Sequence, residues 1–193
     1  MRTLSMAFYP SPLGRLTLAA EGAQLVGLWF EGQRHYAAGV SPEHAEQRLT
    51  PPLCAACAWL DAYFAGRRPA ADALPLAPVG STFRRAVWRL LQKIPYGCTT
   101  TYGALAAELK AAGIAASAQA VGGAVGPNPI SIIIPCHRVL AAHPAAAWNY
   151  AAGADRKRAL LQLESAKYDA EPSRGIGVCK AMQRTADTQK RKL

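Results

Sequence analysis

The sequence predicts an α/β (α+β) protein with two folded parts, on the basis of three observations. Short runs that alternate apolar and polar residues fill the beginning of the chain, and Gly and Pro turns separate them. Later segments repeat apolar residues at helical spacing. Two of these segments are joined by a short turn, as in a helix-turn-helix. With 193 residues, 51% of them hydrophobic, the chain is long enough to bury a full core.

The N-terminal part, residues 1–78, is predicted to be a small domain with an antiparallel sheet and one helix. The helical pattern covers residues 52–66 and stops at Gly66. Residues 67–80 are rich in Pro and Ala and have no periodic pattern, so we expect a linker to the second domain. Two or three strands are expected, at residues 6–9, 15–18 and 24–30.

The second part, residues 79–166, is predicted to be mainly helical. Ser81 or Thr82 can cap its first helix, and Thr99 or Thr100 can cap the next. The expected helices begin near Ser81, at Tyr102, after the cap Ser117 and at Asp155, and they end before Ile94, near Ala112, at Val125 and at Glu164. The second and third of these form the helix-turn-helix. The third contains only small residues and Gln119, which allows close approach to another helix or to a DNA groove.

The chain carries a formal net charge of +10 and has a pI of about 9.7. This balance favours a polyanionic partner, nucleic acid first and an acidic membrane surface second. Residues 167–193 hold 7 Lys/Arg against 3 Asp/Glu, and we expect a basic, largely disordered tail that adds phosphate attraction. The rest of the chain is basic in its own right.

The cysteines and the apolar runs indicate a reduced, cytoplasmic protein, or a nuclear one in a eukaryote. No signal peptide or apolar run of membrane-spanning length is recognised, so we expect no membrane partner. The 5 cysteines are an odd number and cannot all pair internally. Cys54 and Cys57 have a metal-like spacing, but no second Cys or His pair stands at a matching interval. We therefore expect core packing there, and no metal site.

The segment from Ser131 to Val139 carries the chemistry. Its run of Ile residues predicts a buried strand that ends at Pro135, because Pro cannot donate to a strand ladder. Cys136 follows, and its thiol has two interpretations. A buried structural cysteine is the usual one, but the adjacent His137 and Arg138 would favour a reactive thiolate.

Glu164 lies on the apolar stripe of the last predicted helix, four residues after Leu160. A carboxylate on a buried face needs a partner. Two interpretations stay open, a solvated last turn or a carboxylate that holds His137.

The pentapeptide Pro135–Val139 resembles the active-site motif of the O6-alkylguanine-DNA alkyltransferases, the methylated-DNA–protein-cysteine methyltransferases. The resemblance extends from about Tyr9 to Glu164, most of the chain. The further segments that resemble the family, in family order, are 11–14, 63–66, 83–88, 94–97, 101–106, 120–123, 128–129, 149–150 and 160–164.

The resemblance implies a repair protein that flips O6-alkylguanine, with O4-alkylthymine as a second candidate, out of duplex DNA. It implies that Cys136 takes the alkyl group irreversibly, in a single turnover, with no cofactor and no metal. His137 would accept the thiol proton through a water, and Glu164 would orient the imidazole. The small-residue helix would enter the minor groove, with Tyr102 crowding the phosphate of the flipped nucleotide. The protein would act as a monomer.

The resemblance also implies a pocket around the thiol. The carbonyl of Val139 would meet the guanine edge, and the loop at Tyr150 and Ala151 would cover the base and donate to O6. Asn128 would tie the helix-turn-helix to the active-site segment. Arg138 matches a structural arginine, with a phosphate contact as the alternative.

This sequence departs from the family at two places within the matched region. Gln119 stands where an arginine usually fills the gap left by the flipped base, and the loop Leu140–Ala152 has Ala, Pro and Trp in place of glycines. These departures keep a non-catalytic alkyltransferase-like protein open as the second interpretation. A Cys–His hydrolase ranks third, because no oxyanion hole is recognised.

Overall fold

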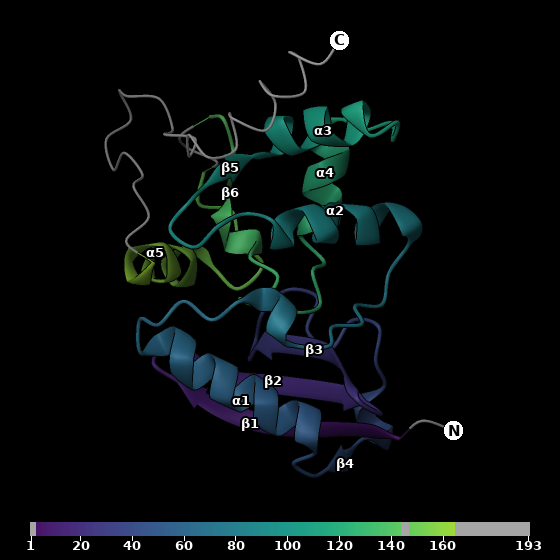
Figure 1. Ribbon diagram of the computed structural model, residues 1–193, viewed down its shortest axis with the longest axis vertical. Helices are drawn as coiled ribbons and strands as arrows, with labels where there is room; N and C mark the ends of the chain where they lie inside the picture. Colours follow the sequence, from purple (N-terminus) through teal and green to yellow (C-terminus); the bar gives the residue numbers. More distant parts are fainter. Residues whose placement is uncertain (1–2, 144–146, 165–193) are drawn as a thin grey trace.

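The computed structural model describes residues 3–143 and 147–164 (Figure 1). In Figure 1 the sheet and helix α1 form the lower half of the molecule, and helices α2, α3 and α4 form the upper half. The expected mixed α/β class is confirmed. The predicted tail, residues 167–193, lies outside the described residues.

The N-terminal sheet has four strands in the order β3-β2-β1-β4. Its three long strands are antiparallel neighbours, as the alternation predicted, and the short β4 pairs parallel to β1. Gly22, with φ of 57°, forms the turn between two of them, where a side chain would be strained. The strands are β1 Leu4–Ser11, β2 Gly14–Glu21, β3 Gln24–Phe30 and β4 Glu46–Gln47.

Helix α1, Pro51–Phe64, packs on one face of this sheet. Its first residue is a proline, which is tolerated in the first turn, and Gly66 follows its end at a φ of 74°. The apolar face includes Leu53 and Leu60, both fully buried, whereas Cys57 is only partly buried. The predicted packing role of this face therefore agrees with the structure.

The predicted linker runs beside the outer edge of β3. The Leu25 N–H donates to the Pro75 carbonyl at 2.9 Å, and the Ala77 N–H donates to the Leu25 carbonyl at 2.8 Å. An edge strand leaves backbone groups without ladder partners. This Pro-rich segment provides hydrogen-bond partners for some of these groups on β3.

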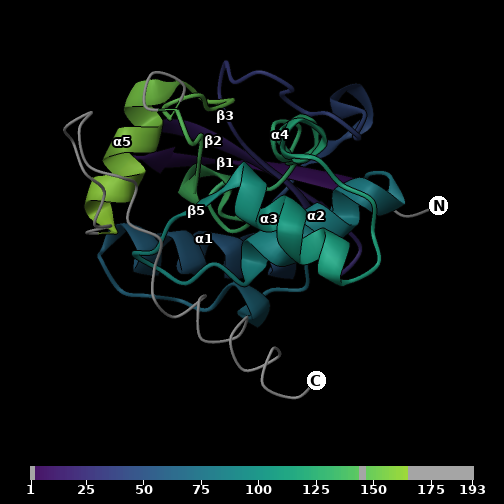
Figure 2. The same cartoon turned by 90° about the horizontal axis from the view of Figure 1, so that it is seen from above.

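The helical part contains α2 Thr82–Gln92, α3 Tyr102–Ala111, α4 Ala118–Val125 and α5 Ala154–Leu163. Ser81 and Ser117 cap α2 and α4, as predicted. Thr101, rather than Thr99 or Thr100, caps α3, because Thr100 and Thr101 first pair with Val139–Leu140 as the short parallel strands β5 and β6. Figure 2 shows α4 end-on beside α2 and α3, with the sheet beneath them.

The prediction of an Ile-rich strand that ends at Pro135 is wrong. Only Ile130 makes a bridge, with Leu28 of β3, and the chain then turns, with Ile132 at a φ of 69°. The turn is followed by a short 3-10 helix, Cys136–Arg138. The Ile side chains are buried as expected, but their backbone groups bond within the turn and to Asn128 instead of to a ladder.

In the described ranges, no helix combines the length and the apolar character that crossing a membrane requires.

Gly27 of β3 provides a test of this packing. A Cβ at Gly27 would lie 1.8 Å from the ring of Trp29, which is fully buried. We expect Gly27→Ala to lower the free energy of unfolding by about 1–3 kcal/mol through overpacking, as measured by chemical denaturation. Gly123→Ala is the matched control, because a Cβ there meets nothing within 4 Å. An equal loss in both variants would contradict the packing of Trp29 over Gly27.

Candidate active site

Cys136 lies at the start of the 3-10 helix and is 6% exposed. The Asn128 side chain approaches it from the segment after α4, with Nδ2 at 3.0 Å from Sγ. The same amide donates to the Ile134 carbonyl at 2.8 Å and accepts from the Ile130 N–H at 3.1 Å. Asn128 therefore joins the end of the helix-turn-helix to the cysteine segment, as the resemblance implied.

Burial raises the pKa of the Cys136 thiol, because an apolar environment disfavours the thiolate. The Asn128 amide, the Tyr150 hydroxyl and the Lys157 ammonium group oppose this rise. The expectation that His137 and Arg138 would favour the thiolate is not met. Both side chains are directed to Glu164 instead.

Glu164 follows the last residue of α5 and is 2% exposed. Its carboxylate accepts from Tyr63 Oη at 2.7 Å, from His137 Nε2 at 2.8 Å and from the Gly97 N–H at 3.3 Å. Arg138 donates to both oxygens, at 2.8 and 2.9 Å. Of the two interpretations of Glu164, the structure shows the carboxylate that holds His137.

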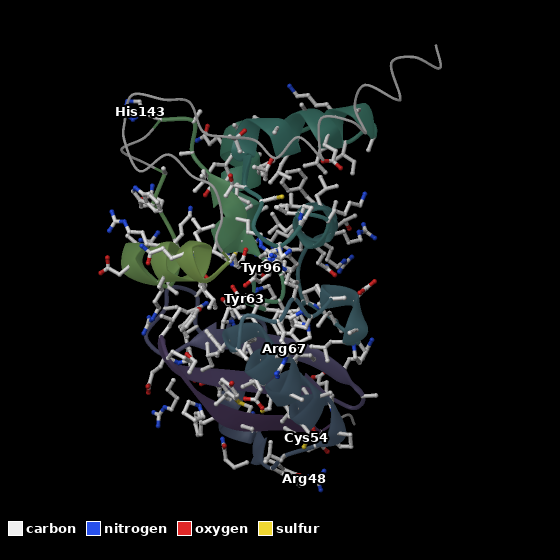
Figure 3. The ribbon with its side chains drawn as sticks, turned by 60° about the vertical axis from the view of Figure 1, so that its left-hand side comes forward. Arg48, Cys54, Tyr63, Arg67, Tyr96 and His143 are labelled. Atoms are coloured by element: carbon white, nitrogen blue, oxygen red, sulfur yellow. The ribbon has the colours of Figure 1, made fainter. Side chains whose placement is uncertain are left out.

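Burial alone would raise the pKa of Glu164, but His137 and Arg138 together hold it well below its usual range. The carboxylate is therefore ionised at neutral pH. Tyr63 and Tyr96 lie near the middle of the molecule in Figure 3, where the sheet domain and the helical part meet. The Glu164 cluster thus joins α1, the Gly97 turn and the cysteine segment.

The His137 imidazole is completely buried, and burial lowers its pKa. The ring is neutral near pH 7, so we assign the Nε2 proton to the bond with Glu164. Nδ1 then carries a free lone pair, and this nitrogen is buried without a hydrogen-bond partner in the described part of the chain. This nitrogen can accept a proton.

Arg138 is a buried structural residue. Its Nη1 also donates to the Ile94 carbonyl at 2.6 Å, and its guanidinium lies 5.7 Å from the centre of the Tyr96 ring. With these bonds and two to Glu164, the guanidinium is not available to a DNA phosphate. The phosphate contact proposed as its alternative role, and its place among DNA-binding residues, are therefore not supported.

Lys157 of α5 was missed by the sequence analysis. It is 1% exposed, and its ammonium group donates to the carbonyls of Val139 and Ala147 at 2.7 Å and of Asn149 at 3.2 Å. Burial lowers its pKa to about 8. The stripe that carries Leu160 and Glu164 also contains Lys157, so the same periodicity could have identified a buried cation.

Of the other predicted site residues, some have contacts close to the thiol and others do not. Tyr102 is near enough to Cys136 for the thiol to affect its pKa, which burial raises, and it also lies against Gly122. Tyr150 has a buried hydroxyl, and the centre of its ring lies 6.5 Å from the centre of the His137 ring. Ala151 is partly buried in the adjoining loop, and Gln119 is exposed on α4.

A helix-turn-helix placed over a buried thiol, with a carboxylate-bound imidazole beside it, defines a DNA-binding protein with a nucleophilic cysteine. Comparison with known proteins agrees with this class. Residues 4–78 match the family model described as 6-O-methylguanine DNA methyltransferase, ribonuclease-like domain, and residues 82–166 match the DNA binding domain of the same description. The chain belongs to the 6-O-methylguanine DNA methyltransferase family.

Curated and solved relatives cover most of the chain. A methylated-DNA–protein-cysteine methyltransferase of Haemophilus influenzae is 37% identical over 168 residues, 87% of this chain and 90% of the relative. The crystal structure of the Mycobacterium tuberculosis O6-methylguanine methyltransferase has a TM-score of 0.70 at 36% identity and covers 88% of this chain and 97% of its own. Mycobacterium tuberculosis OGT in complex with DNA has a TM-score of 0.70 at 39% identity, with coverages of 83% and 92%.

Glu164→Gln tests the buried cluster. The substitution leaves Arg138 without a full counter-charge, and we expect a loss of about 3–5 kcal/mol in the free energy of unfolding at neutral pH. The Glu164 pKa is lowered on folding, so its contribution is present above the ordinary carboxyl value of about 4.3 and is lost as the pH falls.

Denaturation at neutral and at acidic pH should therefore show a smaller pH dependence in Glu164→Gln than in the wild type. Glu43→Gln is the control, because that side chain is exposed. A Glu164→Gln variant as stable as the control would contradict the cluster.

Proposed function

We propose that the chain repairs duplex DNA by moving the alkyl group of O6-alkylguanine onto its own Cys136. The observation that carries this proposal is the buried thiol, which touches Asn128 and lies next to a neutral imidazole held by Glu164. Family membership and the DNA complex of a relative support the same reaction. O4-alkylthymine remains a second candidate substrate.

In the proposed reaction the Cys136 sulfur attacks the alkyl carbon. A carbon–sulfur bond forms, the bond from that carbon to guanine O6 breaks, and guanine leaves with the electron pair. The thiol proton passes to His137 Nδ1 through a water, because the described residues show no direct hydrogen bond between the two side chains. Glu164 stabilises the imidazolium that forms. The guanine then takes up a proton.

The product is a thioether, which simple hydrolysis does not reverse. Each protein molecule would therefore act once. Asn128 and Tyr150 oppose the burial cost of the thiolate, since both lower the pKa of Cys136. No step in this scheme requires a metal ion or a cofactor.

Base flipping would bring the damaged guanine to this buried sulfur, at a cost of a few kcal/mol in stacking and pairing. Gly122 and Gly123 on α4 leave room for the minor groove, and Tyr102 begins α3 beside them. The Ala151 N–H makes no hydrogen bond within the described ranges, which supports its role as the donor to O6. The Val139 carbonyl, which already accepts from Lys157, would meet the guanine edge with its second lone pair.

The charge distribution indicates how DNA is attracted. Residues 1–78 hold 6 Lys/Arg and 6 Asp/Glu, whereas residues 79–166 hold 9 against 3. Residues 111–136, which include all of α4, contain no Asp, Glu, Lys or Arg. We propose that α4 fits the groove by shape, and that the exposed arginines of α2 and the basic tail attract the phosphates.

The protein would act as a monomer in the cytoplasm, or in the nucleus of a eukaryote.

Mass spectrometry of the intact protein and its peptides tests this function. After incubation with duplex DNA that holds one O6-methylguanine, we expect one added methyl group per protein, on the peptide that contains Cys136. Cys136→Ser should remain unmodified, whereas Cys54→Ser, at an exposed thiol, should react normally. Binding of the damaged duplex without a mass change would instead indicate a recognition protein, and many products per protein would indicate a hydrolase.

Gln119→Arg tests the insertion role. An arginine adds charge and a planar guanidinium that can stack in the gap left by the flipped base. A gain of about 1 kcal/mol corresponds to about fivefold faster transfer from duplex substrate. Gln47→Arg adds the same charge at an exposed position of the sheet domain and should change the rate less. Equal rates for Gln119→Arg and the wild type would refute the insertion role.

A further inference from the structure

We propose that Gln33 is a positioning residue for Cys136 and acts through Ser131. Gln33 lies in the turn after β3 and is 5% exposed. Its Oε1 accepts from the Phe30 N–H at 2.9 Å and from Ser131 Oγ at 3.1 Å. The inference takes the reaction of Cys136 from the proposed function. The geometry around Cys136 does not depend on that function.

The outer edge of β3 holds the segment that leads to the cysteine. The Leu28 N–H donates to the Pro129 carbonyl, and the Ser131 N–H donates to the Leu28 carbonyl, both at 2.8 Å. The Gln33 side chain adds a bond to Ser131 just beyond this backbone pair. Ser131 is therefore fixed through its backbone and through its side chain by the N-terminal domain.

Ile132 follows Ser131 at a φ of 69°, a left-handed conformation that a β-branched residue rarely adopts. Such a conformation persists only where the surrounding structure holds it. From this turn the Ile134 N–H bonds to the Ile130 carbonyl at 3.0 Å, and the Cys136 N–H bonds to the Ile134 carbonyl at 2.8 Å. Release of Ser131 would relax the turn and move the sulfur.

The turn after β3 also reaches the loop on the other side of the thiol. The N–H of Arg34, the residue after Gln33, donates to the Ala151 carbonyl at 2.9 Å. Ser131 and Cys136 both lie near enough to the Tyr150 hydroxyl to shift its pKa, which burial raises. Gln33 and Arg34 thus contact both the cysteine segment and the loop proposed to cover the base.

The orientation of the Gln33 amide supports a role for its oxygen. The oxygen makes two bonds, whereas Nε2 is buried without a hydrogen-bond partner among the described residues. A buried donor without a partner is unfavourable. The amide therefore keeps this position because of the bonds to Phe30 and Ser131.

The test compares Gln33→Leu and Ser131→Ala with the wild type. The first readout is the rate at which iodoacetamide, a small thiol-alkylating probe, modifies Cys136 as a function of pH. The second is the methyl-transfer rate from duplex DNA. We expect both variants to react about tenfold or more slowly, because small displacements of a reacting atom have large effects, and we expect a shifted pH profile.

Two further comparisons separate positioning from general destabilisation. The double variant Gln33→Leu/Ser131→Ala should be no slower than the slower single variant, because both changes remove the same bond. Ser131→Thr keeps the hydroxyl and should keep most of the rate. Gln47→Leu, at an exposed glutamine of the sheet domain, is the matched control and should behave as wild type.

A wild-type rate and pH profile in Gln33→Leu, or fully additive losses in the double variant, would overturn the inference. If Gln33→Leu does not fold, the contrast between Ser131→Ala and Ser131→Thr decides the question in the same way. A wild type that takes no methyl from DNA would reject the proposed function. A shifted iodoacetamide profile in Gln33→Leu would still support the role of Gln33.

Discussion

The buried carboxylate of Glu164 is the interaction on which the rest of the structure depends. It receives donors from α1, from the Gly97 turn and from the 3-10 helix that carries the cysteine. A buried charge is tolerated only when it is paired and hydrogen-bonded, and Arg138 meets this need with two bonds. One side chain therefore joins the sheet domain to the helical domain and fixes the ring of His137.

The thiol next to this cluster has a different environment. Cys136 is buried among apolar residues, and its raised pKa is opposed by the Asn128 amide, the Tyr150 hydroxyl and the Lys157 ammonium group. Lys157 is itself held by three backbone carbonyls of the segment from Val139 to Asn149. The contacts that hold this segment thus also place a positive charge near the sulfur.

The sequence was sufficient for features that depend on local chemistry. The helices, two of the three serine or threonine caps in the helical part and the antiparallel strands follow from periodicity and from turn residues. The prediction of a strand at the Ile run was wrong because its backbone groups bond within a turn, to the nearby Asn128 side chain and to the edge of β3, and that edge is distant in sequence. The role of Gln33 could not be predicted from the sequence, since a polar residue in a turn gives no local sign of a partner 98 positions away.

The pairing of β3 with the cysteine segment also matters for solubility. An edge strand as apolar as Leu25–Phe30 is a template on which another chain can add a strand. Pro129–Ser131 and Pro75–Ala77 occupy parts of that edge within the molecule. Displacement of the cysteine segment, by damage or by mutation, would uncover this edge and make the protein prone to aggregate. The segment that carries the reactive thiol therefore also protects the sheet from intermolecular pairing.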